Sequence, residues 1–140
     1  MAGRHTRGDK PPAVVGLCWP PPVKPGDWVA AAAPASPVSR EAWEAGYQLL
    51  QSWGFRVRWT PAIFKPRAYD RGLDRRLARR FEEIWLDPEI KAIIGVRGGY
   101  GSLKLLPHLR YSRLAPHPKR LIGFSDLTNL LVTLNQRLGW

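Results

Sequence analysis

The stretch from Gly123 to Asp126 joins a short apolar run to a leucine-rich segment, and its serine has the placement of a nucleophile. A strand that turns sharply into a helix presents the corner residue beside the first backbone amides of that helix, which carry partial positive charge and can stabilise an oxyanion. Gly123, two residues before Ser125, permits the close approach that such a nucleophile elbow needs. The chemistry this pattern favours is acyl transfer through the Ser125 hydroxyl.

A competing interpretation is that this segment only starts a helix. The match to the elbow pattern G-x-S-x-G is incomplete, because Leu127 stands where the second glycine would be. Serine and aspartate are also preferred N-cap residues, so Ser125 or Asp126 could simply cap the leucine-rich helix. Position alone favours the capping interpretation, and the catalytic one needs support from a second element.

The stretch from Arg97 to Gly101, with the sequence RGGYG, supplies that second element. Its glycines allow positive φ angles and a close approach to a ligand, and the amides of Gly98 and Gly99 could form an anion-binding nest. The Arg97 guanidinium could pair with a carboxylate. The stretch matches neither a P-loop nor the dinucleotide-binding pattern G-x-G-x-x-G, so a plain tight turn remains the alternative.

Hydrophobic patterning predicts the elements that position these two loops. Strand-like runs and helical stripes alternate along the chain. The predicted strands are 28–34, 55–60, 90–96 and 120–124, and the predicted helices run over 39–54, 73–84, 103–109 and 127–138. This alternation is typical of an α/β fold with a parallel sheet and helices on both faces. Ligands of such sheets bind outside the carboxyl ends of the strands, where both loops fall.

Composition narrows the class of protein further. The net charge of the 140 residues is +11, but the arginines are spread over the whole chain, so we expect no nucleic-acid partner. The alternative of nucleic-acid binding stays open, because residues 67–80 include an arginine-rich helix face. A single cysteine, Cys18, excludes an internal disulfide, and no apolar run is long enough to cross a membrane. We therefore expect a cytoplasmic protein, with residues 1–22 as a flexible leader before a domain at 23–140.

Three stretches also resemble the N-terminal signatures of a known family, the LD-carboxypeptidases of serine peptidase family S66, to which the microcin-C immunity peptidases are similar. They are KPGDWVAAAAPASPVS, IKAIIGVRGGYGSLKLLPHL and LIGFSDLTNLL, in that order. The resemblance implies a flavodoxin-like N-terminal domain with Ser125 as nucleophile. It also implies an oxyanion hole made by the Asp126 amide and a glycine amide of Gly98 or Gly99. The implied substrate is a murein tetrapeptide that loses its terminal D-alanine, with no metal or cofactor.

One feature of the family is missing from this sequence. The glutamate and histidine that complete the family's catalytic triad lie in a C-terminal domain, and no position up to Trp140 matches them. The histidines His5, His108 and His117 are not expected to replace the missing base. We therefore expect an inactive front half of the enzyme, in which Arg97 and Tyr100 contact substrate. A homodimer of the complete enzyme is left open, and the alternative is a non-enzymatic α/β module that binds an anion or nucleotide.

Overall fold

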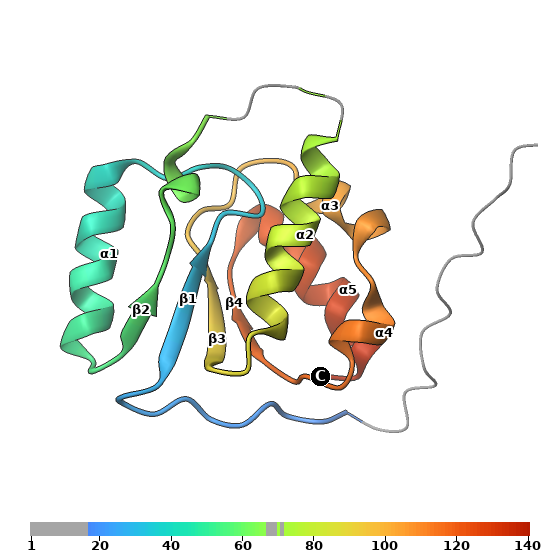
Figure 1. The fold of residues 1–140 in the computed structure, drawn as a ribbon, viewed down its shortest axis with the longest axis horizontal. Helices are drawn as coiled ribbons and strands as arrows, with labels where there is room; N and C mark the ends of the chain where they lie inside the picture. The colour runs from blue at the N-terminus through green and yellow to red at the C-terminus, as the bar shows by residue number, and fades with distance from the viewer. Residues whose placement is uncertain (1–16, 67–69, 71) are drawn as a thin grey trace, which may run out of the picture.

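A four-stranded parallel sheet forms the centre of the molecule (Figure 1). The computed structural model describes residues 17–66, 70 and 72–140. The sheet order is β2-β1-β3-β4, and the strands are β1 (Trp28–Ala32), β2 (Arg56–Arg58), β3 (Ile90–Gly95) and β4 (Arg120–Ile122). Each strand falls inside its predicted range. The predicted α/β class with a parallel sheet is confirmed.

Helices connect the strands as the alternating pattern predicts. They are α1 (Arg40–Ser52), α2 (Leu73–Leu86), α3 (Ser102–Leu105), α4 (Tyr111–Leu114) and α5 (Thr128–Leu138), with 3₁₀ turns η1 (Pro61–Phe64), η2 (Leu106–His108) and η3 (Ser125–Leu127). Ser39 caps α1 as expected, because its Oγ accepts a hydrogen bond from the Ala42 amide at 3.2 Å. The short helix α4 was not expected. Within the described part of the chain, no helix combines the length and apolar character that crossing a bilayer requires.

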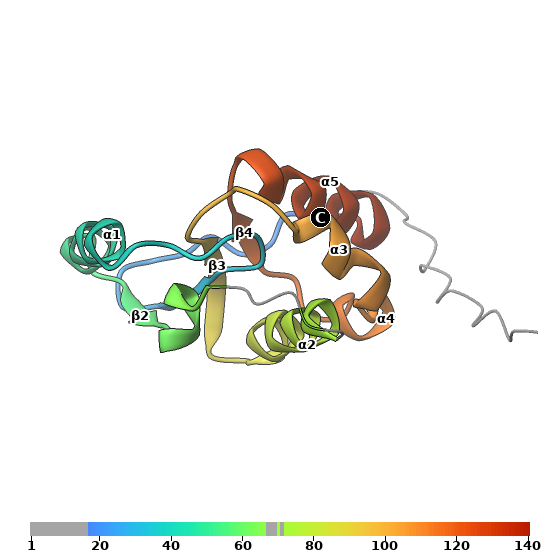
Figure 2. The same ribbon diagram turned by 90° about the horizontal axis from the view of Figure 1, so that it is seen from above.

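The helices cover both faces of the sheet. Successive residues of a strand point to opposite faces, so β1 divides the core into two clusters. Ala31 packs with Trp43 of α1 in one cluster, whereas Ala30 and Ala32 belong to the other cluster, which includes Phe81 of α2. Figure 2 shows α1 and α2 on opposite sides of the sheet. Small side chains on β1 leave room for large aromatic residues such as Trp43 to pack over the central strand.

The segment before β1 runs along the sheet at the amino ends of the strands (Figure 1). Of the predicted leader, residues 1–16 lie outside the described residues. The part from residue 17 onward makes contacts with the domain: the Cys18 amide donates to the Gly139 carbonyl at 2.7 Å, and Arg120 Nε donates to the Pro21 carbonyl at 2.9 Å. The proposed domain boundary at residue 22 stays a prediction.

Candidate active site

Ser125 occupies a strained backbone position at the carboxyl end of β4. Its φ angle is +57°, and it is the only non-glycine residue with positive φ among the residues that the structure describes. Such a conformation costs a residue other than glycine about 1–2 kcal/mol. Strain of this kind persists where surrounding structure enforces it, and it often accompanies function. The side chain of Ser125 is exposed, as a nucleophile must be.

The capping interpretation of Ser125 and Asp126 is wrong for the leucine-rich helix. Both η3 and α5 begin without a side-chain cap. The carboxylate of Asp126 instead serves the start of α3, where Oδ2 accepts a hydrogen bond from the Ser102 amide at 2.8 Å. The Ser125 hydroxyl therefore is not committed to starting α5.

The peptide unit that follows Asp126 is held by two side chains. The Asp126 carbonyl accepts a hydrogen bond from Ser102 Oγ at 2.5 Å and another from Asn129 Nδ2 at 2.9 Å. Ser102 is completely buried, whereas Asp126 and Asn129 are partly buried, so these bonds lie at the edge of the core. The elbow is thus fixed from α3 on one side and from α5 on the other, and the chain just after Ser125 has little freedom to move.

Leu127 explains why the second glycine of the elbow pattern is absent. Leu127 is buried, and its side chain fills the space above Gly95 of β3 and Gly123, which follows β4. A Cβ at Gly95 would lie 2.2 Å from Leu127 Cδ1, and one at Gly123 would lie 2.8 Å from the same atom. These are impossible contacts, so the close approach depends on glycines in β3 and just after β4, and the position after Asp126 carries a large side chain.

The glycine turn after β3 converges on Ser125. Strands β3 and β4 are paired in parallel, so their carboxyl ends are neighbours, as the sequence predicts. A Cβ at Gly98 would lie 2.8 Å from Ser125 Cβ and 3.1 Å from Ser125 Oγ. Gly99 and Gly101 have φ angles of +98° and +116°, which a side chain would rarely allow. The structure therefore brings together the two loops singled out in the sequence.

Ser36, in the loop after β1, is a third part of the site that the sequence analysis missed. Its amide donates to the Gly98 carbonyl at 3.1 Å, and its Oγ accepts from the Tyr100 amide at 3.1 Å. A usable signal existed: β1 pairs with β3, so the loop after β1 must also reach this edge of the sheet. Between two prolines, Ser36 looked like an ordinary loop residue.

The two predicted substrate contacts lie on the same turn. Arg97 is exposed, and its Nη1 donates to the Pro37 carbonyl at 3.2 Å, so part of the guanidinium ties the turn to the loop after β1. Tyr100 is 60% exposed, and Lys104 Nζ lies 4.9 Å from its ring centroid. Their role in holding substrate remains a prediction.

Neither of the two histidines that the structure describes completes the site. His117 precedes β4, whereas Ser125 follows it, so the two residues belong to opposite ends of the same strand. His108 ends η2 and is exposed. His5 lies outside the described residues. The expectation that a base must come from elsewhere therefore stands as a prediction.

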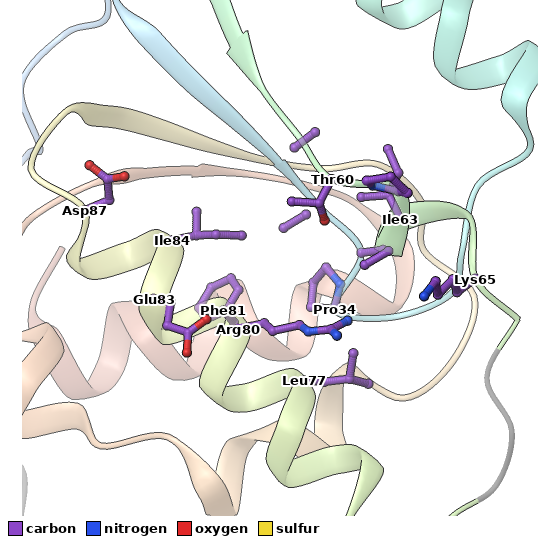
Figure 3. A pocket seen from close by; sticks show the side chains of 15 residues that line it. Pro34, Thr60, Ile63, Lys65, Leu77, Arg80, Phe81, Glu83, Ile84 and Asp87 are labelled. Carbon is purple, nitrogen blue, oxygen red and sulfur yellow. The ribbon is translucent and has the colours of Figure 1, made fainter.

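A separate cavity of about 590 Å³ lies between α2 and η1 (Figure 3). Its wall is mostly apolar and includes Ile63, Leu77 and Phe81, while Lys65 and Arg80 extend toward the end near Pro34. Ser125 does not line it. This cavity is distinct from the exposed Ser125 elbow and was not predicted from the sequence.

Comparison with known proteins identifies the family. Residues 29–140 match the LD-carboxypeptidase N-terminal domain of peptidase S66. A putative carboxypeptidase from Synechocystis is 33% identical over 116 residues, covering 82% of this chain. A probable murein peptide carboxypeptidase from Bacillus subtilis is 29% identical over 120 residues, covering 86% of this chain. The chain belongs to the S66 LD-carboxypeptidase family.

Solved structures agree with this assignment. The crystal structure of an MccF-like protein from Bacillus anthracis superposes with a TM-score of 0.79 at 28% identity, over 88% of this chain. The chain spans only 38% of that protein and 38% of each of the two curated relatives. The similarity therefore concerns the front part of longer proteins.

Proposed function

We propose that this chain carries the nucleophile half of a serine-type LD-carboxypeptidase that acts on murein peptides. The observation that supports it best is the contact between the strained, exposed Ser125 and Gly98. A murein peptide carboxypeptidase is among the relatives, and peptidase activity is a family property. The expected cytoplasmic location, the absence of a nucleic-acid partner and the quaternary state remain predictions.

The proposed reaction proceeds through an acyl-enzyme. Ser125 Oγ attacks the carbonyl carbon that precedes the terminal D-alanine, and its proton passes to a base. The carbonyl oxygen becomes an oxyanion, which the amides of Asp126 and the glycine turn stabilise. The C–N bond then breaks, and the nitrogen of D-alanine leaves with a proton. Water hydrolyses the ester on Ser125, which releases the shortened peptide and restores the hydroxyl.

In our proposal, residues 1–140 do not supply the base that removes the proton of Ser125. A serine hydroxyl is a weak nucleophile until an adjacent base removes its proton. Loss of a triad member leaves only the residual catalysis that the oxyanion hole and binding provide. We therefore propose that residues 1–140 alone have negligible turnover. Catalysis then requires the C-terminal part of the longer relatives.

The test is to restore that part. The chain is fused to the C-terminal portion of the Bacillus subtilis relative, in place of the segment that it matches, and D-alanine release from a murein tetrapeptide is measured. We expect release by the fusion protein, none by its Ser125→Ala variant, and negligible release by the unfused chain. A folded fusion protein that releases no D-alanine, or a Ser125→Ala variant that still releases it, contradicts the proposal.

A second candidate function is a non-enzymatic anion-binding module, and the cavity beside α2 favours it. Lys65 and Arg80 give one end of an apolar cavity a positive charge, which suits a ligand with an apolar body and an anionic group (Figure 3). Calorimetric titration with AMP and with inorganic phosphate tests it. Binding that Arg80→Gln abolishes and Ser125→Ala leaves unchanged, together with an inactive fusion protein, would favour the module. No binding of either probe rejects it.

A further inference from the structure

We infer that Ser36 is a positioning residue that directs the Gly99 amide toward the oxyanion site and removes the Tyr100 amide from it. This inference rests on the proposed function and refines it, because it selects one donor from the glycine turn. Ser36 lies within the first stretch that resembles the family, but the resemblance assigns it no role.

The direction of the Gly99 amide follows from the planarity of the peptide bond. The described residues contain no cis peptide bond, so the carbonyl of Gly98 and the N–H of Gly99 point in opposite directions. The Gly98 carbonyl accepts a hydrogen bond from the Ser36 amide at 3.1 Å and therefore points toward the loop after β1. The Gly99 N–H consequently points away from that loop.

The next amide is already used. The Tyr100 N–H donates to Ser36 Oγ at 3.1 Å, so it faces the loop after β1. Ser36 thus accepts a hydrogen bond from the Gly99–Tyr100 peptide unit through its hydroxyl, and it donates one to the Gly98–Gly99 unit through its backbone N–H. Together these two bonds fix the rotation of both peptide units that flank Gly99.

Close packing reinforces these bonds. A Cβ at Gly99 would lie 2.2 Å from Ser36 Oγ and 2.7 Å from Ser36 Cβ, so the turn lies directly against this serine. At the preceding residue, Gly98 packs against Ser125. Ser36 and Ser125 therefore contact consecutive residues of the turn, so a displacement of Ser36 should also displace the backbone beside Ser125.

An oxyanion donor acts mainly in the transition state, because the negative charge develops only there. Misdirecting the Gly99 amide should therefore lower kcat and leave KM almost unchanged. A small displacement of a catalytic group can cost about 100-fold in rate. Ser36→Ala keeps the backbone bond to the Gly98 carbonyl but frees the peptide unit between Gly99 and Tyr100, so the turn loses one of the two bonds that fix it. We expect a decrease in kcat of about 10- to 100-fold.

The experiment compares Ser36→Ala, Ser36→Thr and Ser39→Ala in the fusion protein. Ser36→Thr retains the hydroxyl and should keep kcat near the unmodified value. Ser39→Ala is the matched control, since Ser39 lies in the same loop but caps α1; it should lower the melting temperature and leave kcat unchanged. Should Ser36→Ala fail to fold, Ser36→Cys keeps the size with a weak acceptor and should also lower kcat.

A structural readout on the unfused chain separates positioning from general damage. Amide hydrogen exchange by NMR should become faster at Tyr100 in Ser36→Ala and stay unchanged in Ser39→Ala. An unchanged kcat in Ser36→Ala, or a loss of kcat that Ser39→Ala reproduces, overturns the inference. A Ser125→Ala fusion protein that still releases D-alanine instead overturns the proposed function, whatever Ser36 does.

Discussion

The side chain of Ser125 lies against Gly98 so closely that a methyl group at residue 98 would stand 2.8 Å from Ser125 Cβ. This contact joins the loop after β3 to the loop after β4 and places the hydroxyl beside the glycine turn. Gly98→Ala should therefore displace Ser125 or the turn, and we expect D-alanine release by the fusion protein to fall about 100-fold or more. Steady-state kinetics on the folded variant measure this. Activity within a few-fold of the unmodified protein would contradict the proposed geometry.

Gly46→Ala is the matched control for that substitution. Gly46 lies inside α1, and a Cβ there would meet no atom within 4 Å. Alanine is favoured over glycine in a helix interior, so the free energy of unfolding should rise by about 0.5–1 kcal/mol. Urea unfolding monitored by circular dichroism measures the change, and kcat should be unaffected.

Leu127 and Gly95 should be energetically coupled. Leu127→Ala removes a buried side chain and should lower the free energy of unfolding by about 2–5 kcal/mol. Gly95→Ala places a methyl group 2.2 Å from Leu127 Cδ1 and should also destabilise, by about 1–3 kcal/mol or more. In the double variant the smaller residue at 127 makes room for the methyl group. A double-mutant cycle should show a loss smaller than the sum, whereas simple additivity would contradict the packing account.

Asp126 allows its side chain and its amide to be tested separately. Asp126→Ala removes the carboxylate that accepts from the Ser102 amide but keeps the backbone N–H proposed for the oxyanion hole. Loss of a helix cap of this kind costs about 1–2 kcal/mol. We expect a lower melting temperature with kcat reduced no more than a few-fold. A loss of activity as large as that of Ser125→Ala would show that the carboxylate itself takes part in the chemistry.

Lys119 should make stability depend on alkaline pH. It is 7% exposed, and burial lowers the pKa of its ammonium group below the ordinary value, although Asp87 opposes this and Lys91 adds to it. Because the folded-state pKa lies below the unfolded-state value, folding releases protons at pH values between the two. Stability should therefore rise as the pH increases from the folded-state pKa toward the ordinary value of 10.5. Urea unfolding at pH 8 and pH 10 should show this rise in the unmodified chain relative to Lys119→Met. Equal pH dependence in both would contradict it.

Much of the fold could be predicted because hydrophobic periodicity is a local property. The alternation of strand-like and helical stretches was enough to place all four strands and to bring the loops after β3 and β4 together. Helix α4 was missed because its four residues are too few for a period to show. Residues 17–22 were predicted as part of a leader from their proline content. Their contacts are with residues such as Arg120 and Gly139, about a hundred positions away, and such contacts leave no local pattern in a sequence.

The site could be predicted only in part, for a similar reason. Ser125 and Gly98 stand in recognisable local patterns, whereas Ser36 acts on a turn more than sixty residues later in the chain. The capping interpretation looked strong because serine and aspartate favour helix starts, and it failed because the Asp126 carboxylate finds its partner at α3. Leu127 departs from the elbow pattern in the sequence, and its explanation, the packing against Gly95, depends on a different strand.

The most direct test of Ser125 as nucleophile is to trap it. The fusion protein is incubated with a fluorophosphonate that carries a D-alanine-like group, and the modified residue is located by mass spectrometry of peptides. We predict a single adduct on Ser125, no adduct in Ser125→Ala, and much slower labelling in the unfused chain. An adduct on a different serine, or labelling that persists in Ser125→Ala, would contradict the account.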